Sequence, residues 1–285
     1  MSKLRIAVQK KGRLSDKSLQ LLRDCGIKIS NGTNKLKAEA SNFPLEVLYL
    51  RDDDIPQYVE QGIADIGILG ENEVLEKRKN VRTVKSLGFS KCRMSLALPK
   101  GTDYPSLSYF NGKRVATSYP NVLEDFFKRN SITAEIEEIS GSVEIAPGIG
   151  LADGILDIVS TGSTLLTNGL EEVEVILKSE AVLISNPALS EDKTEILEKL
   201  LFRIKAVQDA KSNKYILMNA PNAALDDIAK ALPGMKSPSV LPLSIPGWSS
   251  IHSVVNEDDF WEVIDTLKAL GAEGILVVPI EKMMA

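Results

Sequence analysis

The 285-residue sequence has few of the residues on which several common chemistries depend. Its single histidine, His252, argues against a histidine-based zinc site and against a Ser-His-Asp triad, and we interpret it as structural. The two cysteines, Cys25 and Cys92, match no metal or redox spacing, so we expect reduced thiols. General base chemistry must therefore come from carboxylates, unless the reaction needs no strong base.

Long apolar runs and an excess of positive charge are also missing. No run approaches the roughly 18 to 20 apolar residues that cross a bilayer, and the chain enters a strand-like pattern at Leu4 without a signal peptide's apolar core and cleavage site. We therefore expect a cytoplasmic protein with no membrane partner. The net charge of -5 argues against nucleic acid as a partner. It leaves room for a small anion held by backbone N–H groups and one or two arginines.

What the sequence does have is a repeated alternation of short apolar runs with helical patterns. This alternation predicts βαβ units, largely parallel sheets and an α/β fold. A second such block, with its own glycine-rich turns, begins near Cys92. Two blocks suggest two lobes with a ligand-binding cleft between them. The first block has expected strands at 4–8, 45–50 and 66–69, with helices at 15–25 and 54–61. The second has expected strands at 94–98, 114–117, 134–139 and 182–185, with helices at 122–129 and 150–156.

A different pattern follows a long helix expected at 191–210. The order β-α-β-β-α-β, in about 70 residues, is that of the ferredoxin-like split motif. We therefore expect three domains. The first lobe comprises residues 1–90 together with 184–212, the second lobe residues 91–183, and the C-terminal domain residues 213–285.

The stretch from Asp157 to Leu165 carries the most chemistry. An apolar strand leads into a turn in which Gly162 allows successive N–H groups to converge on a phosphate. Asp153 and Asp157, just before the turn, are candidates to face ribose hydroxyls or a magnesium ion. An ordinary Ser/Thr turn after a strand remains an alternative. The turn also supplies four hydroxyl groups, from Ser160, Thr161, Ser163 and Thr164.

Several other segments follow expected strands and are candidates for the same cleft. Gly70, followed by acidic residues, opens towards it, whereas close helix–strand packing explains the earlier glycines of that strand. The remaining candidates keep two readings each: an anion-binding loop or a solvated basic turn at Lys11-Gly-Arg13, a buried ion pair or a solvated acidic run at Arg51-Asp-Asp-Asp54, and purine stacking or core packing for Tyr119.

Taken together, these segments resemble the long form of the ATP phosphoribosyltransferase family, which opens histidine biosynthesis. The resemblance covers the whole chain, and seven motifs occur in order. They are Lys11 to Arg13, Arg51 to Pro56, Gly62 to Asn72, Cys92 to Leu96, Ala116 to Pro120, Gly141 to Pro147 and Asp157 to Leu165.

The resemblance implies two lobes like those of periplasmic binding proteins, a regulatory C-terminal domain, and transfer of phosphoribosyl from phosphoribosyl pyrophosphate to N1 of ATP, with Mg²⁺ as cofactor. It implies catalytic roles for Arg13, Arg51 and Asp157. It places phosphoribosyl pyrophosphate at Asp153, Asp157, Ser160, Thr161, Gly162, Ser163 and Thr164. It places ATP at Lys11, Arg13, Leu69, Gly70, Glu71, Arg93 and Tyr119.

Regulation and assembly are also implied by the resemblance. Histidine is expected as a feedback inhibitor at Asn219, Ser239 and Gly274, in a homo-oligomer between dimer and hexamer. Gly148 stands where relatives often carry a larger or basic residue, which puts a charge contact there in doubt. The rival readings are a two-lobed binding module and a catalytically silent regulatory subunit. The missing signal peptide argues against the first of these and the intact hydroxyl-rich turn against the second.

Overall fold

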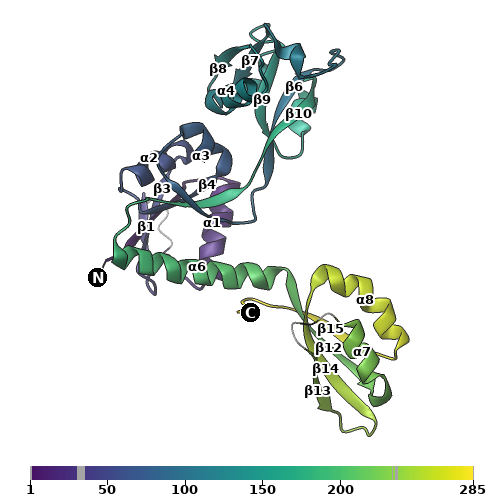
Figure 1. Cartoon of the computed structure of the whole chain (residues 1–285). Helices are drawn as coiled ribbons and strands as arrows, with labels where there is room; N and C mark the ends of the chain where they lie inside the picture. The colour runs from purple at the N-terminus through teal and green to yellow at the C-terminus, as the bar shows by residue number, and fades with distance from the viewer. Residues whose placement is uncertain (1, 31–35, 233, 235–236, 285) are drawn as a thin grey trace. The chain divides into compact units, whose positions relative to one another are not determined.

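Three β-sheets organise the part of the chain that the structure, a computed structural model, describes: residues 2–30, 36–232, 234 and 237–284. The chain divides into two compact units, residues 1–20 with 27–197 and residues 21–26 with 198–285. The first unit contains two sheets, each with its own helices, and the second contains the third sheet (Figure 1). The α/β fold expected from the alternating pattern is confirmed.

The six-stranded sheet with its helices is called the first lobe below. Its order is β2-β3-β1-β4-β11-β5, with β3, β1 and β4 parallel in the centre. Of these central strands, β1 and β4 are mostly buried and mainly apolar, as expected where both faces of a parallel sheet are covered. The bounds are β1 Leu4–Gln9, α1 Arg13–Asp24, β2 Lys37–Glu39, β3 Leu45–Leu50, α2 Ile55–Glu60, β4 Ile66–Gly70, α3 Glu71–Lys77, β5 Arg82–Ser86 and β11 Ala181–Ser185.

The five-stranded sheet with its helices is called the second lobe. Its order is β10-β6-β9-β7-β8, and the chain passes between the lobes twice, from β5 to β6 and from β10 to β11. Phe110 and Phe127 lie in its apolar core. The bounds are β6 Cys92–Pro99, β7 Arg114–Thr117, α4 Pro120–Arg129, β8 Glu135–Glu138, β9 Gly154–Val159, α5 Ser163–Thr167 and β10 Leu170–Ser179.

Two sequence-based expectations about this unit are wrong. The helix expected at 150–156 does not form, because the chain enters β9 at Gly154. A Cβ atom at Gly154 would lie 2.7 Å from Leu98 Cδ2 and 3.1 Å from the Ala97 carbonyl oxygen, so this strand position needs glycine for close packing. The strand expected to close the second block is β11, and it pairs with β4 and β5 in the first lobe.

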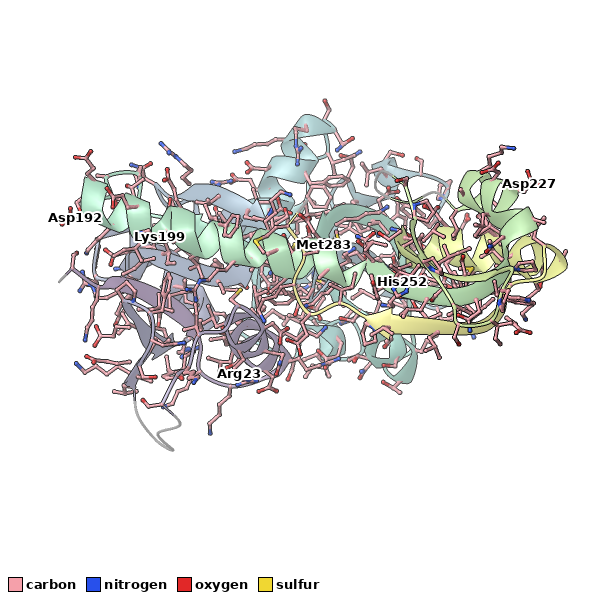
Figure 2. The ribbon with its side chains drawn as sticks, turned by 90° about the horizontal axis from the view of Figure 1, so that it is seen from below. Arg23, Asp192, Lys199, Asp227, His252 and Met283 are labelled. Atoms are coloured by element: carbon pink, nitrogen blue, oxygen red, sulfur yellow. The ribbon has the colours of Figure 1, made fainter. Side chains whose placement is uncertain are left out.

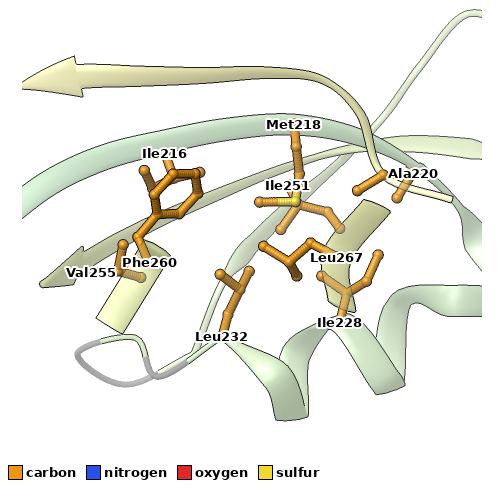
Figure 3. Close-up of a cluster of buried hydrophobic side chains, with 10 residues drawn as sticks. Ile216, Met218, Ala220, Ile228, Leu232, Ile251, Val255, Phe260 and Leu267 are labelled. Atoms are coloured by element: carbon orange, nitrogen blue, oxygen red, sulfur yellow. The ribbon is translucent and has the colours of Figure 1, made fainter. Parts of the chain in front are cut away.

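The third sheet confirms the ferredoxin-like unit. Its order is β13-β14-β12-β15, and every neighbouring pair is antiparallel. Alternate residues of β12 and β14 are buried against two helices, and Met218, Ile251 and Leu267 meet in the core between them (Figure 3). The bounds are β12 Asn213–Pro221, α7 Leu225–Ala231, β13 Ser239–Pro242, β14 Trp248–Asn256, α8 Glu257–Ala269 and β15 Glu273–Pro279.

Helix α6, Glu191–Lys211, leads into this sheet. At the same end of the sheet, where Lys214 pairs with Pro279, the chain returns to the helix, and the Met283 N–H donates to the Ala206 carbonyl at 2.9 Å (Figure 2). Among the described residues, no helix is long and apolar enough to span a membrane.

Candidate functional site

The hydroxyl-rich turn lies at the carboxyl end of β9 and forms one wall of a cavity of about 290 Å³. Gly162 stands at the N-cap of α5 with φ of +82°, a conformation that side chains with a Cβ rarely adopt. Ser160, Thr161, Ser163 and Thr164 of the turn are exposed and Gly162 is half-buried, so the turn is not buried against its own protein. The cavity is lined by Arg13 and by residues 157–165.

The polar groups of this cavity are partly organised by one another. Thr161 Oγ1 and Ser163 Oγ lie 3.0 Å apart and share a hydrogen bond. The Asp157 carboxylate accepts from the Ile158 N–H at 2.7 Å. Burial raises the pKa of Asp157, the Ile158 N–H opposes that shift, and the Glu144 carboxylate adds to it. The cavity therefore combines hydroxyl donors, backbone amides and one partly desolvated carboxyl group, a set suited to a sugar phosphate.

A second cavity, of about 330 Å³, lies between the two lobes. Arg13, Ile158 and Ser160 line both this cavity and the one at the turn, so the two adjoin. Its polar wall comes from the carboxyl ends of several strands in both lobes, which is where ligands of open α/β sheets bind. The lining residues are Gln9, Arg13, Leu14, Lys17, Asp52, Gly70, Asn72, Glu73, Ser90, Lys91, Cys92, Tyr119, Ile158 and Ser160.

A hydrogen bond crosses this second cavity from one lobe to the other. The Tyr119 hydroxyl, from the second lobe, donates to Glu73 Oε1 of the first lobe at 2.9 Å. Burial raises the pKa of Glu73, and the Tyr119 hydroxyl opposes that shift. Burial, and then the Glu73 carboxylate, raise the pKa of Tyr119. The phenol therefore stays protonated and keeps donating throughout the physiological pH range.

Asn72 extends this polar wall. The Ser179 hydroxyl donates to Asn72 Oδ1 at 2.9 Å, and Asn72 Nδ2 donates to Glu73 Oε1 at 3.3 Å. A Cβ atom at Gly70 would collide with Asn72 Oδ1, so this position in the wall has room only for glycine while Asn72 keeps its place.

A third cavity, of about 440 Å³, borders the other two at Ser160. Arg93 forms a two-pronged ion pair with Glu172, with N–O distances of 2.7 Å for Nε and 2.6 Å for Nη2. The Arg93 hydrogen bond lowers the pKa of Glu172. Besides Ser160 and Arg93, its lining residues are Glu71, Lys91, Cys92, Lys178, Ser179 and Glu180.

Eleven of the residues expected to bind substrates line these three cavities: Arg13, Gly70, Glu71, Arg93, Tyr119, Asp157, Ser160, Thr161, Gly162, Ser163 and Thr164. Four expected residues are not among the lining residues of these cavities. Leu69 is fully buried in the core of the first lobe, and Lys11 is exposed.

The other two are Asp153 and Arg51. Asp153 precedes β9 and so lies at the opposite end of that strand from the turn, about 20 Å away at a strand rise of about 3.3 Å per residue. Its carboxylate accepts from the Arg114 N–H at 2.9 Å. Arg51 pairs with Asp53 at 3.3 Å, but its side chain is 79% exposed, so the buried pair considered for this segment is not formed.

The expected histidine contacts lie in the C-terminal sheet. Asn219 and Gly274 are neighbours, since a Cβ atom at Gly274 would lie 3.6 Å from Asn219 Nδ2. Ser239 is on β13, which β14 separates from the strand of Asn219. His252 lies in the same sheet (Figure 2), where Tyr215 Oη is 2.9 Å from Nδ1 and Ser250 Oγ is 3.1 Å from Nε2. Both ring nitrogens are thus engaged, as expected for a structural histidine.

Sequence reasoning gave no individual site role to Gln9, Lys17, Asp52, Asn72, Glu73 and Ser90, although Asp52 lies in a segment that was a candidate for the cleft and Asn72 in one of the seven motifs. The signal that could have found most of them is position: Gln9 ends β1, Asp52 follows β3, and Asn72 and Glu73 follow β4. Ser90 carries a different signal, a φ of +52° in the segment that joins the lobes, and the sequence does not show it.

Comparisons with known proteins agree with this geometry. A family model described as ATP phosphoribosyltransferase matches residues 51–206, and one described as the HisG C-terminal domain matches residues 210–282. ATP phosphoribosyltransferases of Phocaeicola vulgatus and Cytophaga hutchinsonii are 60% and 58% identical over 281 residues, covering 99% of this chain in both cases and 99% and 98% of those chains. A structure of the ATP phosphoribosyl transferase (HisG:HisZ) complex from Thermotoga maritima matches with a TM-score of 0.60 and 32% identity, over 71% of this chain and 98% of that chain. The chain belongs to the ATP phosphoribosyltransferase family.

Proposed function

We propose that this chain transfers the phosphoribosyl group of phosphoribosyl pyrophosphate to N1 of ATP and releases pyrophosphate, the first step of histidine biosynthesis. The observation that carries the proposal is that two polar cavities adjoin and share Arg13, Ile158 and Ser160. Two anionic substrates seated in these cavities would meet at the shared wall, with a guanidinium between them.

Phosphoribosyl pyrophosphate is assigned to the turn cavity. The N–H groups of the turn and the hydroxyls of Thr161, Ser163 and Thr164 would hold the 5-phosphate, and Asp157 would face the ribose. Asp153 is left out of the proposed site, because its carboxylate is engaged at the other end of β9.

ATP is assigned to the cavity between the lobes and its neighbour at Arg93. The ring of Tyr119 would contact adenine, and its hydrogen bond to Glu73 fixes the ring position. Gly70 would let the base approach the backbone closely, and Glu71 and Arg93 line the adjoining space.

The reaction needs alignment more than proton transfer. The lone pair of adenine N1 forms a bond to C1 of the ribose, the C1–O bond breaks, and its electron pair leaves with pyrophosphate. Orienting the two substrates contributes by removing the entropy cost of the encounter. Positive charge at the leaving group stabilises the charge that develops on pyrophosphate, and Arg13, at the shared wall, is placed to supply it.

We also propose Mg²⁺ as cofactor. Among the described residues, no group of three or more His, Cys, Asp or Glu side chains could hold a metal ion. This fits magnesium, which is usually held by one or two carboxylates together with substrate phosphates. Asp157 is the carboxylate of the turn cavity and would be its protein ligand. When bound, the ion would neutralise charge on the pyrophosphate.

The test is release of pyrophosphate by the purified full chain with ATP, phosphoribosyl pyrophosphate and Mg²⁺ all present. We expect release with the complete mixture and none when any one of the three is omitted. Absence of release from the complete mixture would refute the proposal and favour a binding module. Replacing ATP by GTP is a matched control, because GTP keeps the triphosphate and changes the base.

We propose that residues 1–90 with 184–212 form one catalytic lobe and residues 91–183 the other. We further propose that the C-terminal domain, residues 213–285, binds histidine as a feedback inhibitor. The protein would be a homo-oligomer located in the cytoplasm. The proximity of Asn219 and Gly274 supports one histidine contact region. Binding of histidine to a less active state implies that the substrates weaken histidine binding by the same factor. We expect Asn219→Ala to weaken inhibition by about tenfold or more without changing uninhibited turnover; equal inhibition of both proteins would disprove this assignment. Light scattering with and without histidine measures the oligomer size.

A further inference from the structure

Helix α4 of the second lobe begins directly after Tyr119, and its first turn is held by a residue of the first lobe. An α-helix leaves its first N–H groups without partners inside the helix. The N-cap residue normally supplies an acceptor from its own side chain. Tyr119 occupies the N-cap here and forms no such bond, because a phenol cannot reach back to the following amides.

Glu76 of α3 supplies the missing acceptor. Its Oε1 accepts from the Asn121 N–H at 3.2 Å, and its Oε2 accepts from the Val122 N–H at 3.0 Å. Asn121 Nδ2 donates in return to the Glu76 carbonyl at 2.9 Å. The Glu76 side chain is buried, and its carboxylate lies at the N-terminal end of α4, where the helix dipole favours an acidic group.

With these bonds, the start of α4 has no unmet donor. Pro120 has no N–H, Glu76 accepts from the next two residues, and the Leu123 N–H donates to the Tyr119 carbonyl at 3.1 Å. The Tyr119 N–H donates to Thr117 Oγ1 at 2.9 Å. The backbone of Tyr119 is therefore fixed on its own lobe, and the helix that continues from it is fixed to the other lobe.

Helix α3 also holds the Tyr119 side chain, and a further contact joins the two helices. One turn before Glu76 on α3, Glu73 accepts the Tyr119 hydroxyl. Arg78, at the end of α3, donates to the Asn121 carbonyl at 3.1 Å and to Asp125 at 2.8 Å. Glu76 is not among the residues that line the three cavities, so it does not contact a ligand seated there.

We infer that Glu76 is a positioning residue for ATP binding, which acts by holding Tyr119 and the start of α4 against α3. This inference rests on the proposed function for the identity of the ligand. Without the carboxylate, the first turn of α4 loses two acceptors and can separate from α3, and binding of ATP would have to restore the contact. The substitution should therefore weaken binding of ATP and not binding of phosphoribosyl pyrophosphate, because the turn after β9 has no bond to Glu76.

The test uses the full chain with Glu76→Ala, which removes both acceptors, and Glu76→Gln, which keeps one carbonyl oxygen. We expect Glu76→Ala to raise KM for ATP by about threefold to thirtyfold, because ATP binding would have to restore the free energy that the lost helix cap supplied. KM for phosphoribosyl pyrophosphate should change by less than about twofold. Glu76→Gln should fall between the two. Glu124→Gln is the matched control, because Glu124 also contacts α3 through Arg78 but is exposed and caps no helix.

Two further measurements separate positioning from a general loss of structure. Binding of ATP by calorimetry needs no turnover, so it tests Glu76 even if the wild type releases no pyrophosphate, a result that would refute only the proposed function. In a Tyr119→Phe background, the tyrosine contact is already broken, and Glu76→Ala should then add less than about half of its original effect on ATP binding.

Three results would overturn the inference: unchanged ATP binding in folded Glu76→Ala, equal weakening of both substrates, or the full effect of Glu76→Ala in the Tyr119→Phe background. Circular dichroism checks folding, and if Glu76→Ala does not fold, the comparison of Glu76→Gln with Glu124→Gln carries the same outcomes.

Discussion

A single methyl group at Gly162 tests whether the turn after β9 holds a substrate. Gly162 has φ of +82° and ψ of -1°, in the left-handed region. An added Cβ would have room, since its nearest neighbour is Val159 Cγ1 at 4.0 Å, so the penalty of Gly162→Ala comes from the backbone alone. The left-handed conformation costs a residue with a Cβ roughly 1–2 kcal/mol, and the turn relieves this by re-aiming its amides. If binding of phosphoribosyl pyrophosphate must return these amides to their original direction, it has to supply that energy, and KM for this substrate should rise by about fivefold to thirtyfold.

The chain offers a close control at the other end of the same helix. Gly169 follows α5 with φ of +68° and has nothing within 4 Å of an added Cβ, so Gly169→Ala carries similar backbone strain. It does not line the turn cavity. Both variants should lose similar stability in thermal unfolding, and initial rates of pyrophosphate release should show a raised KM for phosphoribosyl pyrophosphate in Gly162→Ala alone. Equal KM values in the two variants would refute the assignment of the turn.

Two further predictions concern the cavity walls. Gly70→Ala should displace the Asn72 side chain from its bonds with Ser179 and Glu73. It should lower the free energy of unfolding by about 1–3 kcal/mol in chemical denaturation and raise KM for ATP. A variant as stable as wild type would show that Asn72 moves freely. Asp157→Asn should lower turnover but raise the melting temperature near pH 8. Because burial raises the pKa of Asp157, its contribution to stability is fully present below its ordinary pKa of 3.8 and is lost as the pH rises through the folded-state pKa. The gain in melting temperature should therefore shrink towards pH 4, and a gain that does not depend on pH would contradict this cause.

Much of the fold could be predicted because its signals are local. Buried parallel strands appear as short apolar runs, and the C-terminal unit shows its order directly in the alternation of periods 2 and 3.6. The placement of β11 could not be predicted this way. Residues 181–185 are separated by more than a hundred residues from their partner β4, and nothing within the run itself indicates which sheet it joins.

The candidate site was predictable where a residue follows a strand, and less so where strand direction or exposure decides. Asp153 and Asp157 are the same residue type and close in sequence, yet β9 runs between Asp153 and the turn, and only Asp157 lines the cavity. Leu69 and Gly70 are adjacent, but the Leu69 side chain turns into the core and only Gly70 reaches the cavity wall. Glu73 and Tyr119 are 46 residues apart, and their hydrogen bond depends on how the lobes meet.

Both cavities are lined by residues from both lobes. Arg13 belongs to the first lobe and Ser160 to the second, and both line the same two cavities. If the two substrates bind as proposed, the separation between them is set by the placement of one lobe against the other, which no single motif encodes. Since reacting atoms must approach to within about 3–3.5 Å, a small shift between α3 and α4 would misalign the substrates even with every cavity residue intact. A site of this kind needs no histidine base, but it does need the two lobes to be held in one relative placement. The buried contacts of Glu73 and Glu76 with Tyr119 and the start of α4 help to hold it.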